Sequence, residues 1–276
     1  MAARSKPRLL LALALPPVIA TYGIHRGLQT LEQRYPPQPP EQTSSIALRT
    51  PQDPSTQQCP HVDIFAARVP LKALQNRVQQ AQGNANNANN NSNPTVQDLT
   101  TAWAQTFLGS RVFRAEACAI GLFRGAGLNP GDLGDTPAKF SPDAARDNAP
   151  RVLANGVAVV VRAPAEDDTN GLLVRWSVPD GPRRFFEKIS TWGYPWRLMS
   201  GGRHEMSISE PFGGEEEGEG DGGPFVEVRF SSAHDYEVVA SEGNCQKVLP
   251  EWGGRLHRGY ARFLLDIAVR ELEKEV

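Results

Sequence analysis

The clearest pattern of apolar and polar positions runs from Phe225 to Val239. Alternate residues form one set that begins apolar and then turns polar: Val226, Val228, Phe230, Ser232, His234, Tyr236 and Val238. Such alternation places successive side chains on opposite faces of a β-sheet. The pattern therefore predicts a strand with this set toward a core and the other set mostly toward water. Strands usually have about five or six residues, so we expect a bend near Ser231–Ala233.

Shorter alternating runs predict further strands, and Asn170-Gly171 is a typical hairpin turn. The strands are expected at His61–Val69, Val152–Ala163, Leu172–Val178 and His204–Glu210. Apolar residues at helical spacing predict helices within Thr95–Phe123, over Asp180–Trp192 and over Glu251–Glu275. The last helix has an apolar arc that we expect to face the sheet: Trp252, Leu256, Tyr260, Phe263, Leu264 and Ile267. This order predicts an α+β fold in which a curved antiparallel sheet packs around a long C-terminal helix.

The N-terminal segment, residues 1–35, has the pattern of a targeting or anchor sequence. Three basic residues, Arg4, Lys6 and Arg8, precede the uncharged run Leu9–Ile24. A straight membrane-spanning helix needs about 20 apolar residues, and this run is shorter. We expect an N-terminal hydrophobic helix that anchors the protein in a mitochondrial or endomembrane bilayer through residues 9–24. The alternative is a secretory signal that is cleaved near Ala20.

Composition divides the rest of the chain. Residues 36–60 are rich in Pro, Gln, Ser and Thr, which predicts a disordered linker. Residues 61–276 then form a single α+β domain, with disordered inserts expected near 83–94, 125–150 and 213–223, where Asn, Gly, Pro or acidic residues accumulate.

Charge and cysteine content exclude several classes of function. The net charge is −2, and the acidic residues lie mainly beyond the N-terminal segment. An acidic body argues against nucleic acid as a partner, because nucleic-acid binding needs a basic surface. The three cysteines, Cys59, Cys118 and Cys245, have no metal-binding or redox spacing. We therefore expect no cofactor and no metal.

The polar end of the Phe225–Val239 pattern is the main candidate site. Pairing with His204–Glu210 on the same face requires His204 to lie opposite Phe230 or Ser232. Ligand pockets are mostly apolar with a few polar groups, so a lipid or another hydrophobic small molecule is the expected ligand. A plain buried hydrogen-bond network is the other interpretation. The candidate pocket residues are Trp176, His204, Met206, Phe230, Ser232, His234, Tyr236 and Tyr260.

Catalytic chemistry has weaker signals. Ser232 and His234 are expected roughly 7 Å apart along the strand, beyond hydrogen-bond reach, and Asp235 points to the opposite face. We therefore assign no catalytic residue. A hydrolase or isomerase that uses His204 and His234 is an alternative function.

Aromatic and basic residues alternate from Arg183 to Arg203. This mixture suits a membrane interface or a partner surface. The candidates for such an interface are Phe185, Phe186, Trp192, Tyr194 and Trp196. A structural or interaction protein is therefore a further alternative.

The order of predicted elements over residues 61–276 resembles the helix-grip fold of the START-like lipid-transfer superfamily. That resemblance implies an apolar cavity between a curved sheet and the last helix. The whole chain is also similar to single-anchor membrane proteins of filamentous fungi, through the run Trp192–Glu205 (WGYPWRLMSGGRHE). This second resemblance implies an N-terminal anchor but no particular activity.

Overall fold

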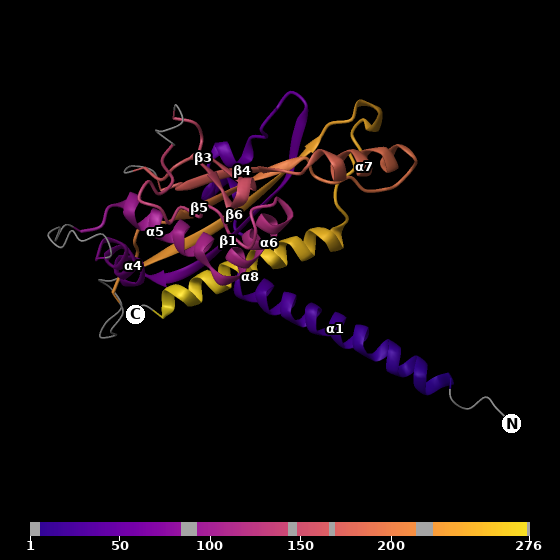
Figure 1. The fold of residues 1–276 in the computed structure, drawn as a ribbon, viewed down its shortest axis with the longest axis horizontal. Helices are drawn as coiled ribbons and strands as arrows, with labels where there is room; N and C mark the ends of the chain where they lie inside the picture. Colours follow the sequence, from indigo (N-terminus) through magenta and orange to yellow (C-terminus); the bar gives the residue numbers. More distant parts are fainter. Residues whose placement is uncertain (1–5, 84–92, 143–147, 166–168, 214–222, 275–276) are drawn as a thin grey trace.

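The computed structural model describes residues 6–83, 93–142, 148–165, 169–213 and 223–274, with side chains from residue 19 onward. The fold is α+β. Within these described ranges, six strands form one curved antiparallel sheet with the order β1-β6-β5-β4-β3-β2 (Figure 1). The strands are β1 (Gln57–Pro70), β2 (Val152–Leu153), β3 (Ala158–Arg162), β4 (Leu172–Ser177), β5 (Gly201–Ile208) and β6 (Phe225–Glu237).

Helices lie on both faces of this sheet. The helices are α1 (Lys6–Arg34), α2 (Pro40–Thr43), α3 (Ile46–Arg49), α4 (Leu71–Gly83), α5 (Val96–Gly109), α6 (Arg111–Phe123), α7 (Asp180–Thr191) and α8 (Glu251–Glu273). The long helix α8 crosses β1 and β6, while α5 lies over β4 and β5. The helices α4 and α6 pack beside α5 and α8. The predicted α+β class and the antiparallel sheet with a packed C-terminal helix are confirmed.

The core between α5 and the sheet follows directly from the helical pattern. A capping box of Thr95 and Asp98 begins α5. One turn later Trp103 is fully buried and its indole N–H donates to the carbonyl of Arg229 on β6 at 3.0 Å. Phe107 stacks on Phe230 with ring centroids 4.4 Å apart. The apolar half of β6 is therefore part of the packed core.

The C-terminal helix faces the sheet with a different side from the one we expected. Of the predicted arc, Leu264 is buried, but Trp252, Leu256, Tyr260 and Phe263 are exposed. The buried face instead includes Gly259, Ala261, Arg262, Leu265, Asp266, Ala268, Val269 and Leu272. Small residues let the helix approach closely, and the two charged residues find partners: Arg262 donates to the carbonyl of Tyr35, and Tyr35 donates to Asp266. The predicted arc of large apolar side chains is therefore mostly on the outer side of α8, and the prediction of which side faces the sheet is wrong.

The middle of the second face of the sheet is also buried, although the sequence predicts that this face mostly meets water. Residues 36–56, predicted as part of a disordered linker, form α2 and α3 and lie against β1, β5 and β6. Leu48 is fully buried there against Leu173 and Ala233. The backbone N–H and the hydroxyl of Ser45 donate to the buried carboxylate of Glu205. Leu48 and Ser45 attach this segment to the sheet, but the polar composition around them is typical of a linker. The prediction of a disordered linker is therefore wrong for residues 36–56.

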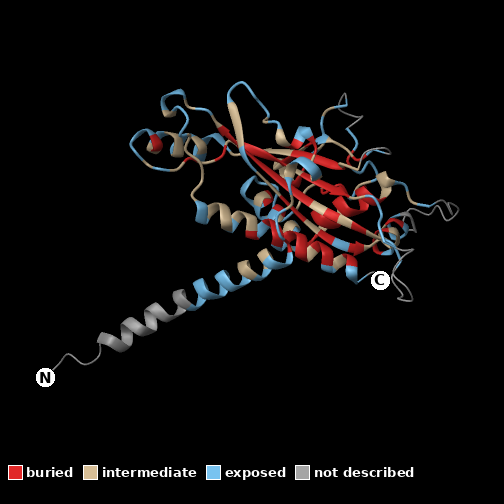
Figure 2. Ribbon diagram, turned by 180° about the vertical axis from the view of Figure 1, so that it is seen from behind, coloured by how far each residue is buried: buried red, intermediate tan, exposed pale blue. Residues whose placement is uncertain are grey.

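Ion pairs fix the same face. Arg203 on β5 forms a bidentate pair with Asp235 on β6, and its Nε donates to the carbonyl of Leu48 at 2.7 Å. Arg162 on β3 donates to Glu205 at 2.8 Å. Both acidic side chains are almost fully buried. Figure 2 shows the resulting band of buried residues along the sheet.

Part of the predicted insert near 125–150 is ordered as well. Leu133 and Phe140 are almost fully buried in the core. Gly134 has φ +77°, and a Cβ atom at this position would overlap the ring of Phe140. Glycine at position 134 therefore lets the ring of Phe140 pack against the backbone. The prediction of disorder is wrong for residues 125–142. Residues 143–147 and most of the inserts near 83–94 and 213–223 lie outside the described residues.

The helix α1 projects from the body of the protein, as Figure 1 shows. Its C-terminal end is attached to α8: Glu32 accepts two hydrogen bonds from Arg255, and Leu28 contacts Gly259. The expected anchor, residues 9–24, falls largely on side chains outside the described residues. Within the described part of the chain, no helix is both long enough and apolar enough to cross a membrane.

Candidate functional site

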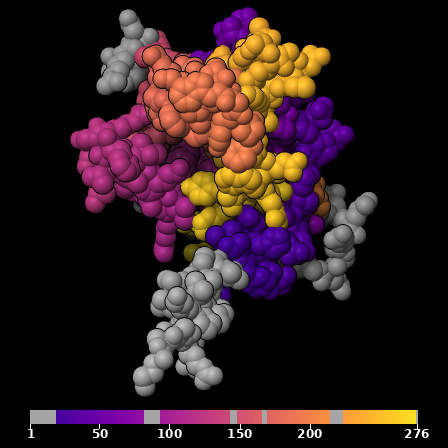
Figure 3. Space-filling model, turned by 90° about the vertical axis from the view of Figure 1, so that its right-hand side faces the viewer, coloured from indigo at the N-terminus to yellow at the C-terminus, as the bar shows by residue number. Residues whose placement is uncertain are grey.

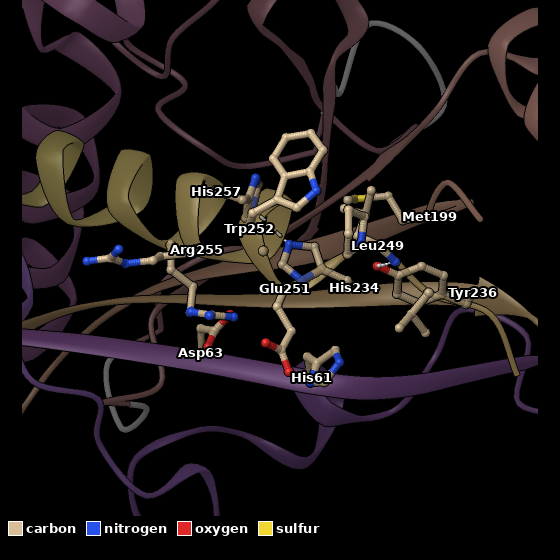
Figure 4. Close-up of a pocket in the computed structure, with 14 residues that line it drawn as sticks. His61, Asp63, Met199, His234, Tyr236, Leu249, Glu251, Trp252, Arg255 and His257 are labelled. Carbon is tan, nitrogen blue, oxygen red and sulfur yellow. Dashed lines mark hydrogen bonds between the residues drawn. The ribbon is translucent and has the colours of Figure 1, made fainter. Parts of the chain in front are cut away.

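A cavity of about 760 Å³ lies between the sheet and the N-terminal half of α8 (Figure 4). Its apolar side is formed by Met199, Tyr236, Val248, Leu249, Pro250 and Trp252. Its polar side is formed by His61, Asp63, His234, Glu251, His257 and Arg258. Figure 4 shows Met199, Leu249 and Tyr236 on one side of His234 and Asp63 and His257 on the other, so the apolar and polar lining residues are partly separated.

Strand register brings the polar residues together. In the pairing of β1 with β6, His61 lies opposite His234 and Asp63 lies opposite Ser232. Residues that alternate along a strand share a face, so all four side chains lie on the side toward α8. On β5, His204 lies opposite Ser232, which is one of the two predicted registers. A register shift in β1 between Gln58 and His61 lies at the same end of the sheet, whereas β6 continues through the expected bend.

Two histidines form the centre of the polar wall. The Nε2 atoms of His234 on β6 and His257 on α8 are 2.8 Å apart. One of these nitrogens must carry a hydrogen and donate it to the other, so the two neutral rings have opposite tautomers. Burial, with a smaller contribution from the charge of His257, lowers the pKa of His234 to about 2. Burial also lowers the pKa of His257, against the opposing effect of Asp63. The pair is therefore neutral near pH 7.

Ser232 lies closer to His234 than the sequence predicts. Its Oγ is 3.2 Å from His234 Nε2, within hydrogen-bond distance, because both side chains lean along the strand. The expected separation of roughly 7 Å is therefore wrong for these atoms. Asp235 belongs to the opposite face, where it pairs with Arg203. Ser232 is almost fully buried beneath His234, so the two do not form a hydrolase triad.

Charged groups complete the polar wall. Burial raises the pKa of Asp63, while Arg258, His61 and His257 oppose this effect. Arg255 borders the cavity but is already engaged, since Glu32 accepts from it at 2.8 and 2.9 Å. Within the described residues, no group of three His, Cys, Asp or Glu side chains is arranged to hold a metal ion.

The predicted pocket residues have three different environments. His234 and Tyr236 line the cavity. Met206 and Phe230 belong to the packed core. Trp176 and His204 lie beside the cavity, with the Trp176 ring 5.7 Å from His204 and 6.1 Å from His234. Burial lowers the pKa of His204 to about 3, so this ring is also neutral.

Tyr260 lies apart from this group. It is on the outer side of α8, where its hydroxyl donates to Glu116 at 2.5 Å. The sequence placed it on the inner arc, so this difference has the same origin as the misassigned face of α8.

The predicted interface residues Phe185, Phe186, Trp192, Tyr194 and Trp196 lie on α7 and the segment after it. Phe185 and Trp192 are exposed, and none of the five lines the cavity. Trp196 contacts Trp252 at 5.8 Å between ring centroids, which brings this aromatic group to the edge of the cavity.

Four residues line the cavity without being among the predicted pocket residues: His257, Arg258, His61 and Asp63. His61 and Asp63 carry a usable signal, because their spacing puts both on one strand face. Recognising them as part of the site requires the register with β6. His257 and Arg258 required knowledge of which side of α8 faces the sheet.

Comparisons of the chain with protein-family models, with curated proteins and with solved structures found no match. The site is therefore interpreted from its own geometry.

Proposed function

We propose that this protein binds an amphipathic small molecule of lipid type between the sheet and the N-terminal half of α8. The observation that carries this proposal is the cavity of about 760 Å³ with its apolar and polar lining residues. Small-molecule sites typically have volumes of about 300–1,000 Å³ and combine apolar walls with a few placed polar groups. The cavity satisfies both conditions.

The surrounding packing defines how the ligand lies. Toward the C-terminal half of α8, Phe65, Leu265 and Ala268 are buried in the core. A ligand is therefore confined to the end of the sheet that carries His61, Asp63 and His234. Its apolar part faces Leu249, and its polar part faces the two histidines. A long acyl chain would not fit along the whole of α8.

This arrangement supports, as a proposal, the helix-grip architecture implied by the resemblance to START-like proteins. The C-terminal helix lies across an antiparallel sheet, and a cavity lies between them. The additional β2 edge strand and the ordered segment 36–56 would be departures from a compact member of that superfamily.

Titration with a fluorescent acyl-chain probe tests ligand binding. Leu249→Trp places a large ring in the cavity and should weaken binding of the probe to the purified full-length chain at least tenfold. Val161→Trp is the matched control, because Val161 is exposed on β3 and does not line the cavity. Equal affinity in the wild-type protein, the Leu249 variant and the control would overturn the proposal.

A second candidate is an acid–base enzyme of hydrolase or isomerase type. The hydrogen bond between His234 and His257 favours this candidate, because the two Nε2 atoms are close enough to exchange a proton. The partner of His234 would then be His257 and not His204. This candidate predicts that His257→Gln retains the ligand that co-purifies with the protein but no longer converts it. If the wild-type protein leaves that ligand chemically unchanged, the enzymatic candidate is excluded.

A further inference from the structure

A connected row of aromatic side chains runs from α7 to the edge of the cavity. We call it the aromatic ridge: five rings in mutual contact, Phe185, Phe186, Tyr194, Trp196 and Trp252, together with Trp192 at the end of α7, whose ring lies beside Lys188. Successive ring centroids are 5.4 Å apart from Phe185 to Phe186 and 6.3 Å from Phe186 to Tyr194. They are 5.3 Å apart from Tyr194 to Trp196 and 5.8 Å from Trp196 to Trp252. The ridge thus links α7 to the first turn of α8.

The ridge is not part of the core. Phe185 is 59% exposed, Trp192 is 72% exposed and Trp252 is 60% exposed. Contacts between neighbouring rings hold them on the surface without covering their outer faces. Single exposed apolar residues are common, but a contiguous group of large rings marks an interaction surface.

Charge around the ridge points to an anionic partner. On α7, Arg183 and Arg184 are ion-paired with Asp180 and Glu187, so Lys188 is the basic residue of this helix that stands beside the rings. The Lys188 amine lies 5.4 Å from the centroid of the Trp192 ring. Trp and Tyr rings with neighbouring Lys or Arg are typical of side chains at a membrane–water interface.

The position of α1 points to the same kind of partner. Figure 3 shows α7, the start of α8 and α1 on one face of the molecule. On α1, the described apolar side chains Ile19, Tyr22 and Ile24 are exposed by 56–64%. The N-terminal helix, which carries these exposed apolar groups, therefore leaves the body on the face that carries the ridge.

We propose that the aromatic ridge is a membrane-docking surface that rests on a bilayer containing anionic lipid. Docked in this way, Phe185, Trp192 and Trp252 enter the headgroup region, and Lys188 meets lipid phosphates. Because Trp252 belongs both to the ridge and to the cavity wall, the docked protein has its cavity next to the bilayer. A water-soluble protein partner is the competing occupant. A bilayer is favoured because α1, with its exposed apolar side chains, emerges on the same face as the ridge.

Hydrogen–deuterium exchange of the full-length chain tests the proposal with vesicles of 70% phosphatidylcholine and 30% phosphatidylserine. Vesicles should slow exchange at least threefold in residues 183–196 and 251–256. This readout reports on the ridge itself, whether or not α1 also inserts. The protection should disappear in the triple variant Phe185→Ser, Trp192→Ser, Trp252→Ser.

The matched control is Val152→Ser with Val161→Ser, two exposed apolar residues on β2 and β3. This control should keep the full vesicle protection, and unchanged exchange of the core strands shows that each variant is folded. Absence of protection in the wild-type chain, or equal protection in the triple variant, overturns the proposal. A protein that does not bind vesicles could still bind the fluorescent probe in its cavity, so the two proposals are tested separately.

Discussion

His257 of α8 and His234 of β6 face each other with their Nε2 atoms 2.8 Å apart. They are 23 residues apart in the sequence, on β6 and on the α-helix that follows it, and both line the cavity. Since one proton is shared between the buried His234 and the half-buried His257, a second proton would have to enter a poorly solvated site. The contact therefore ties the stability of the fold to pH.

Acidification should destabilise the protein through its buried histidines. The pKa values of His234 and His204 are lowered to about 2 and about 3 in the folded state. The unfolded chain binds a proton at each histidine near pH 6.5, whereas the folded state does not. The free energy of unfolding should therefore fall by up to about 1.4 kcal/mol per pH unit and histidine as pH drops from about 6.5 toward 4. Urea unfolding between pH 7.5 and 4.5 measures this slope.

Replacing His204 tests whether the buried histidines cause the pH dependence of the free energy of unfolding. His204→Leu should reduce the number of protons taken up on unfolding in acid by about one, which lowers the slope of unfolding free energy against pH. Phe230→Leu should lower the free energy of unfolding equally at every pH. An unchanged slope in His204→Leu would contradict the assignment to buried histidines.

On the second face of the sheet, Arg203 and Asp235 form a buried ion pair. Removing one partner should destabilise the protein more than replacing both partners with apolar residues. Arg203→Met leaves Asp235 charged and buried, which should cost about 3–5 kcal/mol. Replacing both residues, by Arg203→Met with Asp235→Leu, should restore much of this loss because no charge is then left unpaired. Chemical denaturation measures each free energy. The exposed pair of Arg184 and Asp180 is the control, and Arg184→Ala should change stability by less than about 1 kcal/mol.

The attachment of α1 depends on a glycine. A Cβ atom at Gly259 would overlap the side chain of Leu28. Gly259→Leu should therefore push α1 away from α8 and speed amide exchange in residues 25–34 at least tenfold. Gly253→Leu serves as the control, because a Cβ there meets only Pro250 at ordinary contact distances of 3.5–3.6 Å. Unchanged exchange in the Gly259 variant would show that the contact does not hold α1.

The proposed membrane anchor over residues 9–24 has a direct test. Alkaline carbonate extraction of the tagged full-length chain should leave the protein in the membrane pellet. Recovery of a shortened protein in the soluble fraction would instead support cleavage near Ala20. Recovery of the full-length protein there would contradict both interpretations.

Local patterns predicted most elements but not how they face each other. The capping box of Thr95 and Asp98 and the alternation along β6 depend on near neighbours in sequence, and both appear in the structure. The parity of β6 also gave a correct register for His204. These features need no information about distant parts of the chain.

The features that the sequence analysis missed depend on distant partners. Burial of Ser231, Ala233 and Asp235 requires the segment around Leu48, whose composition is that of a linker. The inner side of α8 is set by Gly259, Arg262 and Asp266, which pack or pair with α1 and Tyr35. Since His257 enters the site only through that orientation, the centre of the candidate site could not be found from local periodicity.

The central claim is that the cavity holds an amphipathic small molecule. Organic extraction and mass spectrometry of the purified full-length chain test it most directly, with Leu249→Trp prepared in parallel. The account predicts a stoichiometric amphipathic molecule in the wild-type extract, reduced at least tenfold in the variant. An extract without any such molecule, or with the same amount in both proteins, would contradict it.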